Sequence, residues 1–113
     1  MFTTQGGIVL NAVDIWESLL AQSLEKPIEL KTKTGLNFKL ISNGKFLTVY
    51  ESEIVPSSKL KSPRPIYKDN FMKVCPYYER WMAGEKGISK EITAITGNSV
   101  YIMAAVSYQA DQR

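Results

Sequence analysis

The chain has 113 residues, of which 44% are hydrophobic and 22% charged, and we expect one ordinary globular domain. It contains no histidine and a single cysteine, Cys75. This composition removes His-based acid–base chemistry, serine and cysteine triads and nearly every zinc site. We therefore expect a protein that is not an enzyme and that binds no cofactor, metal or small-molecule substrate. The single cysteine, the lack of any apolar run near the ~20 residues of a membrane helix and the lack of a secretory signal predict a cytoplasmic protein without membrane contact.

The net charge of +3 is concentrated in one window. Residues 1–55 carry −1, from five basic and six acidic residues, and residues 74–113 carry zero, from four of each. Residues 56–73 carry +4, because Asp69 alone opposes five basic residues: Lys59, Lys61, Arg64, Lys68 and Lys73. A concentrated basic segment attracts polyanions, so this window is where we expect DNA phosphates to bind.

The first predicted helix spans residues 11–25. Residues 1–10 are mostly uncharged and include Gly6-Gly7, so a loose start is expected there. From Asn11, the predicted N-cap, apolar residues recur at spacings of three and four until Pro27, which disfavours helical geometry in the residue before it. The apolar stripe, which we expect to face the core, consists of Ala12, Ile15, Trp16, Leu19, Leu20 and Leu24.

Residues 28–51 are predicted to form a three-stranded antiparallel meander. Asn43-Gly44 lies between two strand-like runs and is typical of a two-residue hairpin turn, because both turn residues adopt positive φ. This turn predicts two cross-strand pairs: Leu40 with Leu47, and Phe38 with Val49.

The first hairpin of the meander is predicted to turn through a three-residue loop, Lys33-Thr34-Gly35, with Gly35 in the left-handed region. Its predicted pairs are Leu30 with Phe38, and Ile28 with Leu40. Both hairpins place their apolar residues on the same face, and such agreement between two separate turns is expected of a real register. Helix 11–25 is available to cover this face.

The opposite face of the predicted sheet carries polar, basic and aromatic side chains: Lys31, Asn37, Lys39, Lys45, Thr48 and Tyr50, together with Ile41 and Phe46. Two interpretations stay open. Aromatic and basic side chains could stack bases and hold phosphates. Alternatively, the face is solvated and Ile41 forms one cross-strand apolar pair with Phe46.

Residues 52–67 contain prolines and serines without hydrophobic periodicity, and we expect a loop there. Loops of this length are usually functional or mobile. The basic residues Lys59, Lys61 and Arg64 in this loop could follow a phosphate backbone. A flexible loop without a partner is the alternative.

A further amphipathic helix is predicted over residues 69–83, capped by Asp69 and interrupted by Pro76. Its apolar stripe consists of Phe71, Val74, Cys75, Tyr78, Trp81 and Met82. Cys75 lies on this stripe and has no histidine to activate it, so we expect a buried packing role for it.

Residues 88–108 predict two short helices joined by a tight turn. Ser89 and Ser99 are the predicted N-caps, and Gly97 is free to take the left-handed conformation that ends a helix. The expected inward positions are Ile92, Ile95, Val100, Met103 and Val106. The spacing resembles the helix-turn-helix of DNA-binding proteins, with a small residue, Thr93, four residues before a glycine. An ordinary helical hairpin shares this pattern and is the alternative.

The resemblance implies a DNA-binding surface. The helix from Ser99 would face a groove of the duplex, with Asn98, Ser99 and Tyr101 toward it. The phosphate backbone would be held by the basic side chains nearby, which are Lys59, Lys61, Arg64, Lys68 and Lys90.

The elements together predict an α+β fold: an N-terminal helix, a three-stranded antiparallel meander, and a C-terminal helical trio that ends in the helix-turn-helix-like pair. One domain spans residues 1–113, with residues 110–113 as a frayed tail. In general shape this order resembles small bacterial or phage accessory proteins.

Two functions stay open at this point. The first is a small DNA-binding accessory or regulatory protein, which the concentrated charge favours. The second is a protein-interaction module, such as a phage- or mobile-element-encoded inhibitor of a host protein. Tyrosines would anchor that partner, because tyrosine is enriched at binding centres. The chain could form a homodimer in either case.

Overall fold

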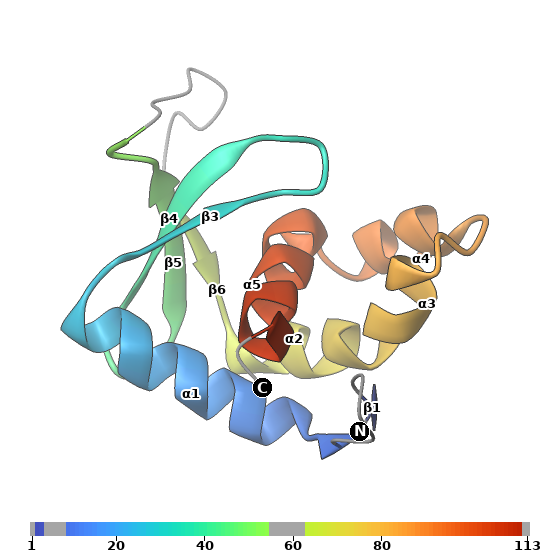
Figure 1. The fold of residues 1–113 in the computed structure, drawn as a ribbon, viewed down its shortest axis with the longest axis horizontal. Helices are drawn as coiled ribbons and strands as arrows, with labels where there is room; N and C mark the ends of the chain where they lie inside the picture. Colours follow the sequence, from blue (N-terminus) through green and yellow to red (C-terminus); the bar gives the residue numbers. More distant parts are fainter. Residues whose placement is uncertain (1, 4–8, 55–62, 112–113) are drawn as a thin grey trace.

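The computed structural model describes residues 2–3, 9–54 and 63–111. Its fold class is α+β, as predicted: an N-terminal helix, a four-stranded antiparallel sheet and three C-terminal helical segments, the first of them interrupted (Figure 1). The elements are β1 Phe2–Thr3, β2 Val9–Leu10, α1 Ala12–Glu25, β3 Ile28–Lys31, β4 Asn37–Ser42, β5 Leu47–Glu51, β6 Arg64–Ile66, α2 Lys68–Val74, a 3-10 turn Cys75–Tyr77, α3 Tyr78–Met82, α4 Ile88–Ile95 and α5 Ser99–Asp111.

The start of the chain is not loose where it is described. Strands β1 and β2 pair antiparallel, with Phe2 opposite Leu10 and Thr3 opposite Val9. Likewise, α5 continues to Asp111, past the point where a frayed tail was expected to begin.

Helix α1 begins as predicted. The Asn11 side-chain oxygen accepts a hydrogen bond of 2.8 Å from the Val13 N–H, which satisfies an amide of the first turn. The apolar stripe is buried at Ile15, Trp16 and Leu19. Leu24, however, is 58% exposed, so its predicted burial is wrong. In this last turn Ser23 points inward instead, and its hydroxyl donates a 2.6 Å hydrogen bond to the Leu19 carbonyl.

The first hairpin has the predicted register, with Ile28 opposite Leu40 and Leu30 opposite Phe38. The Thr32 N–H donates to the Leu36 carbonyl at 2.9 Å, so residues 33–35 form the loop. Gly35 has a φ of 98°, the left-handed conformation that this loop requires.

The second hairpin is shifted by two residues from its predicted register. Leu40 pairs with Val49 and Ser42 with Leu47, so the turn has four residues, 43–46. The reason is the Asn43 side chain, whose oxygen accepts hydrogen bonds from the N–H groups of Lys45 and Phe46 at 2.9 and 3.0 Å. Side chains alternate with a period of two along a strand, so a shift of two leaves the same residues on the core face.

A fourth strand, β6, lies within the segment that was expected to be a loop. Ile66 pairs with Leu47 and is 1% exposed, and Arg64 pairs with Val49. The prolines on either side of Arg64 argue against a central strand, because proline lacks the N–H of a ladder hydrogen bond. At a sheet edge this cost disappears, and β6 is an edge strand in the order β3-β4-β5-β6.

The predicted helix over residues 69–83 is broken at Pro76, as expected, into α2, a 3-10 turn and α3. It begins at Lys68, so Asp69 lies in the first turn and is not the cap. Five of its six stripe residues are buried, including Cys75. Met82 is 55% exposed, contrary to prediction, because α3 ends there and the chain turns away at Gly84, which has a φ of 72°.

The helical pair α4–α5 differs from its prediction at both caps and at the turn. Gly87, with a φ of 84°, precedes α4, so Ser89 is not its cap. Gly97 is not left-handed, and Ser99 is the first residue of α5. Val100, expected to point inward, is 42% exposed. From Tyr101 to Val106, however, α5 is buried on all sides, because these six consecutive side chains are all buried.

The molecule has two layers (Figure 1). Helices α1 and α5 cover one face of the sheet, and the core lies between them, with Phe38 edge-on to Tyr101 at 5.1 Å and Trp16 tilted on Phe71 at 5.1 Å. The opposite face carries Lys39, whose ammonium group lies 5.8 Å from the centre of the Tyr50 ring. No helix in the described ranges is long and apolar enough to span a membrane.

The predicted apolar pair between Ile41 and Phe46 on this opposite face does not form. Ile41 pairs with Thr48, because of the two-residue shift, and the Phe46 ring packs against Tyr67 at 5.0 Å.

Phe38 is fully buried between the sheet and α5, so we expect Phe38→Ala to lower the free energy of unfolding by about 3–5 kcal/mol, the usual cost for a core aromatic residue. Urea denaturation measures this. Tyr50→Ala, on the partly exposed opposite face, is the matched control and should cost roughly 1 kcal/mol. Equal losses for the two variants would contradict the assignment of the two faces.

Cys75 is fully buried, and this burial raises the pKa of its thiol from 9.0 to about 12. The thiol therefore ionises more easily in the unfolded chain. Its contribution to stability is complete below about pH 9 and is lost as the pH rises toward 12. We expect the stability difference between the natural protein and Cys75→Ala to shrink over this range in urea titrations. A difference that stays constant, or rapid labelling of the native thiol, would show that Cys75 is accessible.

Candidate functional site

The structure places the predicted DNA-binding residues in different surroundings. Lys59 and Lys61 lie outside the described residues. Ser99 and Tyr101 are 2% and 7% exposed, so the prediction that they face a DNA groove is wrong. Tyr101 packs on Phe38, and the Ser99 hydroxyl lies 3.3 Å from that of Thr93. The helix that was predicted to face DNA, α5, therefore packs into the hydrophobic core.

Arg64 and Asn98 come together from positions 34 residues apart in the chain. The Arg64 guanidinium donates to the Asn98 side-chain oxygen at 3.0 Å, and the Asn98 side-chain N–H donates to the Pro65 carbonyl at 3.0 Å. The same guanidinium lies 5.9 Å from the centre of the Tyr101 ring. These contacts fix strand β6 to the start of α5, and Arg64 remains exposed.

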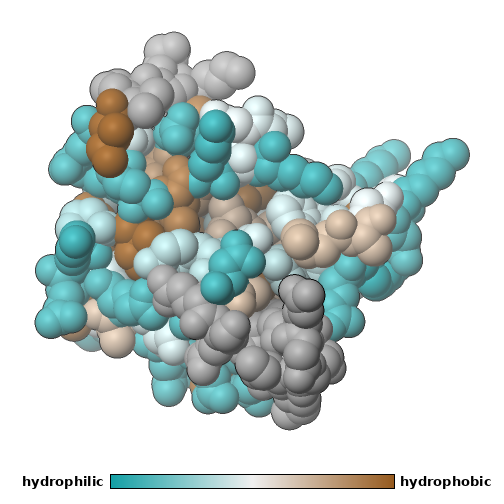
Figure 2. Space-filling model, in the orientation of Figure 1, coloured by the Kyte–Doolittle hydropathy of each residue, from teal (hydrophilic) through white to brown (hydrophobic). Residues whose placement is uncertain are grey.

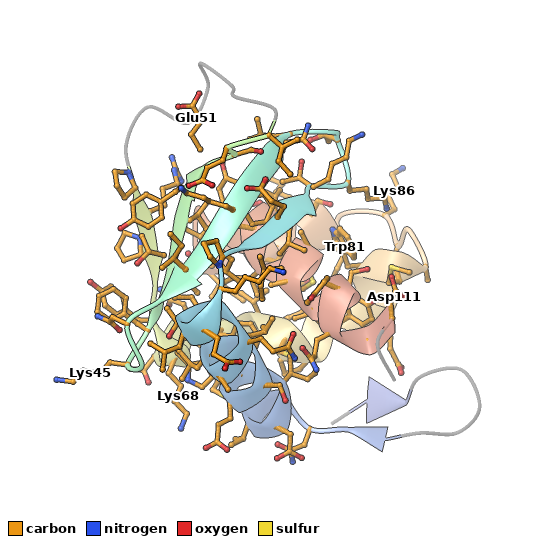
Figure 3. The ribbon with its side chains drawn as sticks, turned by 60° about the vertical axis from the view of Figure 1, so that its left-hand side comes forward. Lys45, Glu51, Lys68, Trp81, Lys86 and Asp111 are labelled. Carbon is orange, nitrogen blue, oxygen red and sulfur yellow. The ribbon has the colours of Figure 1, made fainter. Side chains whose placement is uncertain are left out.

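The other two predicted contacts, Lys68 and Lys90, are exposed but belong to different parts of the surface. Lys68 begins α2, and Figure 3 places it near Lys45 and on the opposite side of the molecule from Lys86, which precedes α4. Lys90 is on α4, which lies on the far side of α5 from β6 in Figure 1. The predicted basic residues that are described therefore do not form one continuous surface.

A different site, absent from the predictions, lies along β3. In the part of the chain that the structure describes, β4 is the only strand paired with β3, so β3 has a free edge. The Thr32 N–H points toward β4, because it donates to Leu36. Backbone groups alternate in direction along an antiparallel strand. The N–H and C=O groups of Glu29 and Lys31 therefore point away from the sheet, toward the free edge.

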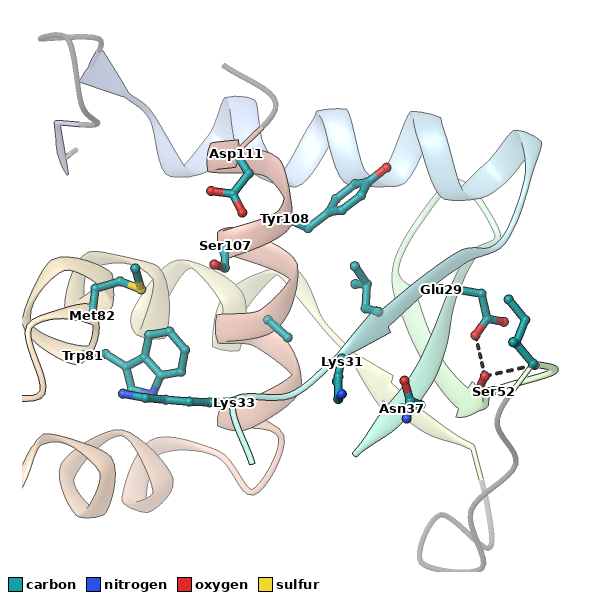
Figure 4. Close-up of a pocket in the computed structure, with 13 residues that line it drawn as sticks. Glu29, Lys31, Lys33, Asn37, Ser52, Trp81, Met82, Ser107, Tyr108 and Asp111 are labelled. Atoms are coloured by element: carbon teal, nitrogen blue, oxygen red, sulfur yellow. Dashed lines mark hydrogen bonds between the residues drawn. The ribbon is translucent and has the colours of Figure 1, made fainter. Parts of the chain in front are cut away.

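A groove of about 630 Å³ runs beside this edge (Figure 4). Its walls come from β3 and the following turn, from α3, from the last turns of α5, and from the segment after β5. The lining residues are Glu29, Leu30, Lys31 and Lys33; Trp81 and Met82; Ala104, Ser107, Tyr108 and Asp111; Ser52 and Ile54; and Asn37 of β4.

The groove combines an apolar surface with a few charges. Six large hydrophobic side chains are exposed in the described ranges, and two of them, Ile54 at 73% and Met82 at 55%, line this groove. Figure 2 shows apolar atoms, in brown, exposed in a hollow between hydrophilic side chains on one face of the molecule. Clefts that bind ligands are commonly lined by apolar side chains with a few polar groups among them.

The charged side chains of the groove differ in how far they are already engaged. The Glu29 carboxylate accepts hydrogen bonds from the Ser52 hydroxyl at 2.5 Å and the Glu53 N–H at 3.3 Å. The Lys33 ammonium group lies over the Trp81 ring, 4.9 Å from its centre. Lys31 is exposed, and within the described ranges it forms no ion pair.

No group of three or more His, Cys, Asp or Glu side chains among the described residues is placed to hold a metal ion. Sequence reasoning did not find this groove, because its walls come from four separate segments. One local signal was available: β3 is the first strand of the predicted meander, and a first strand is often an edge strand.

No protein-family model, characterised protein or solved structure matches this chain at a significant level.

Proposed function

We propose that this protein is a non-enzymatic protein-interaction module, and that the groove beside β3 receives an extended segment of a partner protein. The observation that carries this proposal concerns β3: among the described residues only β4 pairs with it, and its other edge lies along a groove lined by α3 and α5. Peptide-binding domains often place a free strand beside a helix, because the strand offers backbone hydrogen bonds and the helix offers side-chain contacts.

The chemistry of the groove supports a protein partner. Apolar side chains such as Leu30, Met82 and Ile54 can contact side chains of a partner, while a hydrophobic core with a polar rim is usual for protein interfaces. The aromatic residues Trp81 and Tyr108 stand in the same groove, and these residue types often contribute most of the binding energy. The lack of histidine agrees with a function that needs no acid–base catalyst.

The test is a selection of random peptides displayed on phage against the immobilised protein. We expect enriched peptides whose binding is weakened at least about tenfold by Met82→Asp or by Ile54→Asp, because a charge in the groove disfavours apolar contact. Both residues are exposed, so neither change should unfold the protein.

The matched control is Leu24→Asp. Leu24 is 58% exposed, much like Met82, but it lies on α1 and does not line the groove. The proposal would be contradicted if the selected peptides bound Met82→Asp, Ile54→Asp and Leu24→Asp with the same affinity as the natural protein. A selection that enriches no sequence would also contradict it.

Duplex DNA is the second candidate partner, favoured by the +4 charge of residues 56–73 and by the exposed Arg64 beside Asn98. In this alternative the phosphates contact the basic segment, and α5 takes no part in reading bases. Binding would then be largely independent of DNA sequence, because phosphate contacts carry no sequence information.

If this second function is correct, DNA affinity should fall with salt, with a slope of log K against log salt of roughly −3 to −4 for four phosphate contacts. Replacing Lys59, Lys61 and Arg64 together by Ala should make the slope shallower by about two to three units. Replacing Lys26, Lys33 and Lys86 by Ala changes the net charge equally and is the control. No binding at ~50 mM salt, where such contacts are strongest, would exclude DNA.

A further inference from the structure

We infer that the partner segment binds as a fifth strand of the sheet, paired with β3, with apolar side chains toward α3 and α5 and acidic side chains toward Lys31. This inference rests on the proposed function of the groove. It adds the mode of binding, which is strand addition, and the class of ligand, which is an extended segment that alternates apolar and acidic residues.

Two residues of β3 have backbone groups that an added strand could pair with. Leu30 is paired with Phe38, and its backbone groups point into the sheet. Glu29 and Lys31, on either side of it, direct their N–H and C=O groups to the free edge. A strand laid beside β3 can therefore form backbone hydrogen bonds with both Glu29 and Lys31, whether it runs antiparallel or parallel to β3.

The two faces of an added strand would meet different surroundings. Leu30 shares the core face with Phe38, and the groove wall on that side contains Ala104, Tyr108 and Trp81. Side chains of an added strand that point this way would contact this largely apolar wall, which also includes Ser107 and Asp111 at the end of α5. The alternate side chains would point to the opposite face of the sheet, where Lys31 is exposed. We therefore expect the bound segment to alternate apolar residues with residues that can interact favourably with the Lys31 ammonium group.

The charge on that opposite face favours acidic side chains. Glu29, the carboxylate nearest to Lys31 along β3, already accepts hydrogen bonds from the Ser52 hydroxyl and the Glu53 N–H. Lys39, the basic residue of the neighbouring strand, is paired with Glu53. Lys31 has no such partner within the described ranges, and Lys33 contacts only the neutral Trp81 ring. Two cations at one end of the strand edge therefore remain to be matched by a ligand.

The experiment uses an octapeptide of alternating valine and glutamate, capped at both ends, and a matched octapeptide of alternating valine and lysine. Backbone amides are followed by nitrogen-edited NMR on the natural protein. We expect the glutamate peptide to slow hydrogen exchange at Glu29 and Lys31 by about tenfold or more at saturation, because their N–H groups enter a ladder. The Leu30 amide, already bonded to β4, should change little.

A charge reversal tests the ligand class. Lys31→Glu combined with Lys33→Glu should weaken binding of the glutamate peptide roughly tenfold and strengthen binding of the lysine peptide. The matched control is Lys45→Glu combined with Lys86→Glu, two exposed lysines outside the groove, which changes the net charge equally. Equal binding of the two peptides to the natural protein would overturn the acidic preference.

The outcomes separate this inference from the proposed function. Suppose the phage selection yields peptides whose binding the groove variants weaken, while the Glu29 and Lys31 amides stay unprotected when those peptides bind. In that case strand addition is wrong, and the proposal of a protein-interaction module stands. If no peptide binds the groove, both the proposed function and strand addition are wrong. If the two amides are protected without peptide, increasingly at higher protein concentration, the edge belongs to a second copy of the chain and the inference is overturned.

Discussion

The burial of α5 on all sides over residues 101–106 is the constraint that shapes this molecule. A helix with six consecutive buried side chains has no face to offer water, so it must be surrounded. The sheet covers it through Phe38, which lies edge-on to Tyr101, and α1 covers it through the hydrogen bond from Gln22 to the buried Gln109. The remaining helices close the other sides. Along the last turns of α5, the flank next to β3 borders the groove.

Periodic patterns predicted the faces of the elements well. Spacing alone found Ile15, Trp16 and Leu19 of α1 and the core face of the predicted meander, and even the two-residue shift at Asn43 left Leu47 and Val49 buried, because the shift equals the period of a strand. Patterns predicted α5 poorly. Its apolar residues form a continuous run, which indicates a helix buried all round, whereas the helix-turn-helix interpretation required one stripe and one exposed face.

The candidate site could not be predicted in the same way, because it depends on tertiary packing. Lys31, Met82 and Tyr108 become neighbours of one groove only after β3, α3 and α5 have packed. Arg64 and Asn98 were both named from the sequence, but the hydrogen bond that joins them depends on β6, a three-residue strand that the prolines on either side of Arg64 argued against. Local chemistry predicts turns and caps, while contacts between distant segments follow from how the layers stack.

The order of the elements along the chain also affects folding during synthesis. The helix that completes the core is α5, and its contacts reach back to α1, 87 residues earlier at the Gln22–Gln109 bond. A nascent chain that still lacks residues 99–111 can cover the apolar face of the sheet with α1 alone, and Phe38 then lacks its contact with Tyr101. The complete core can therefore form only after α5 has been synthesised.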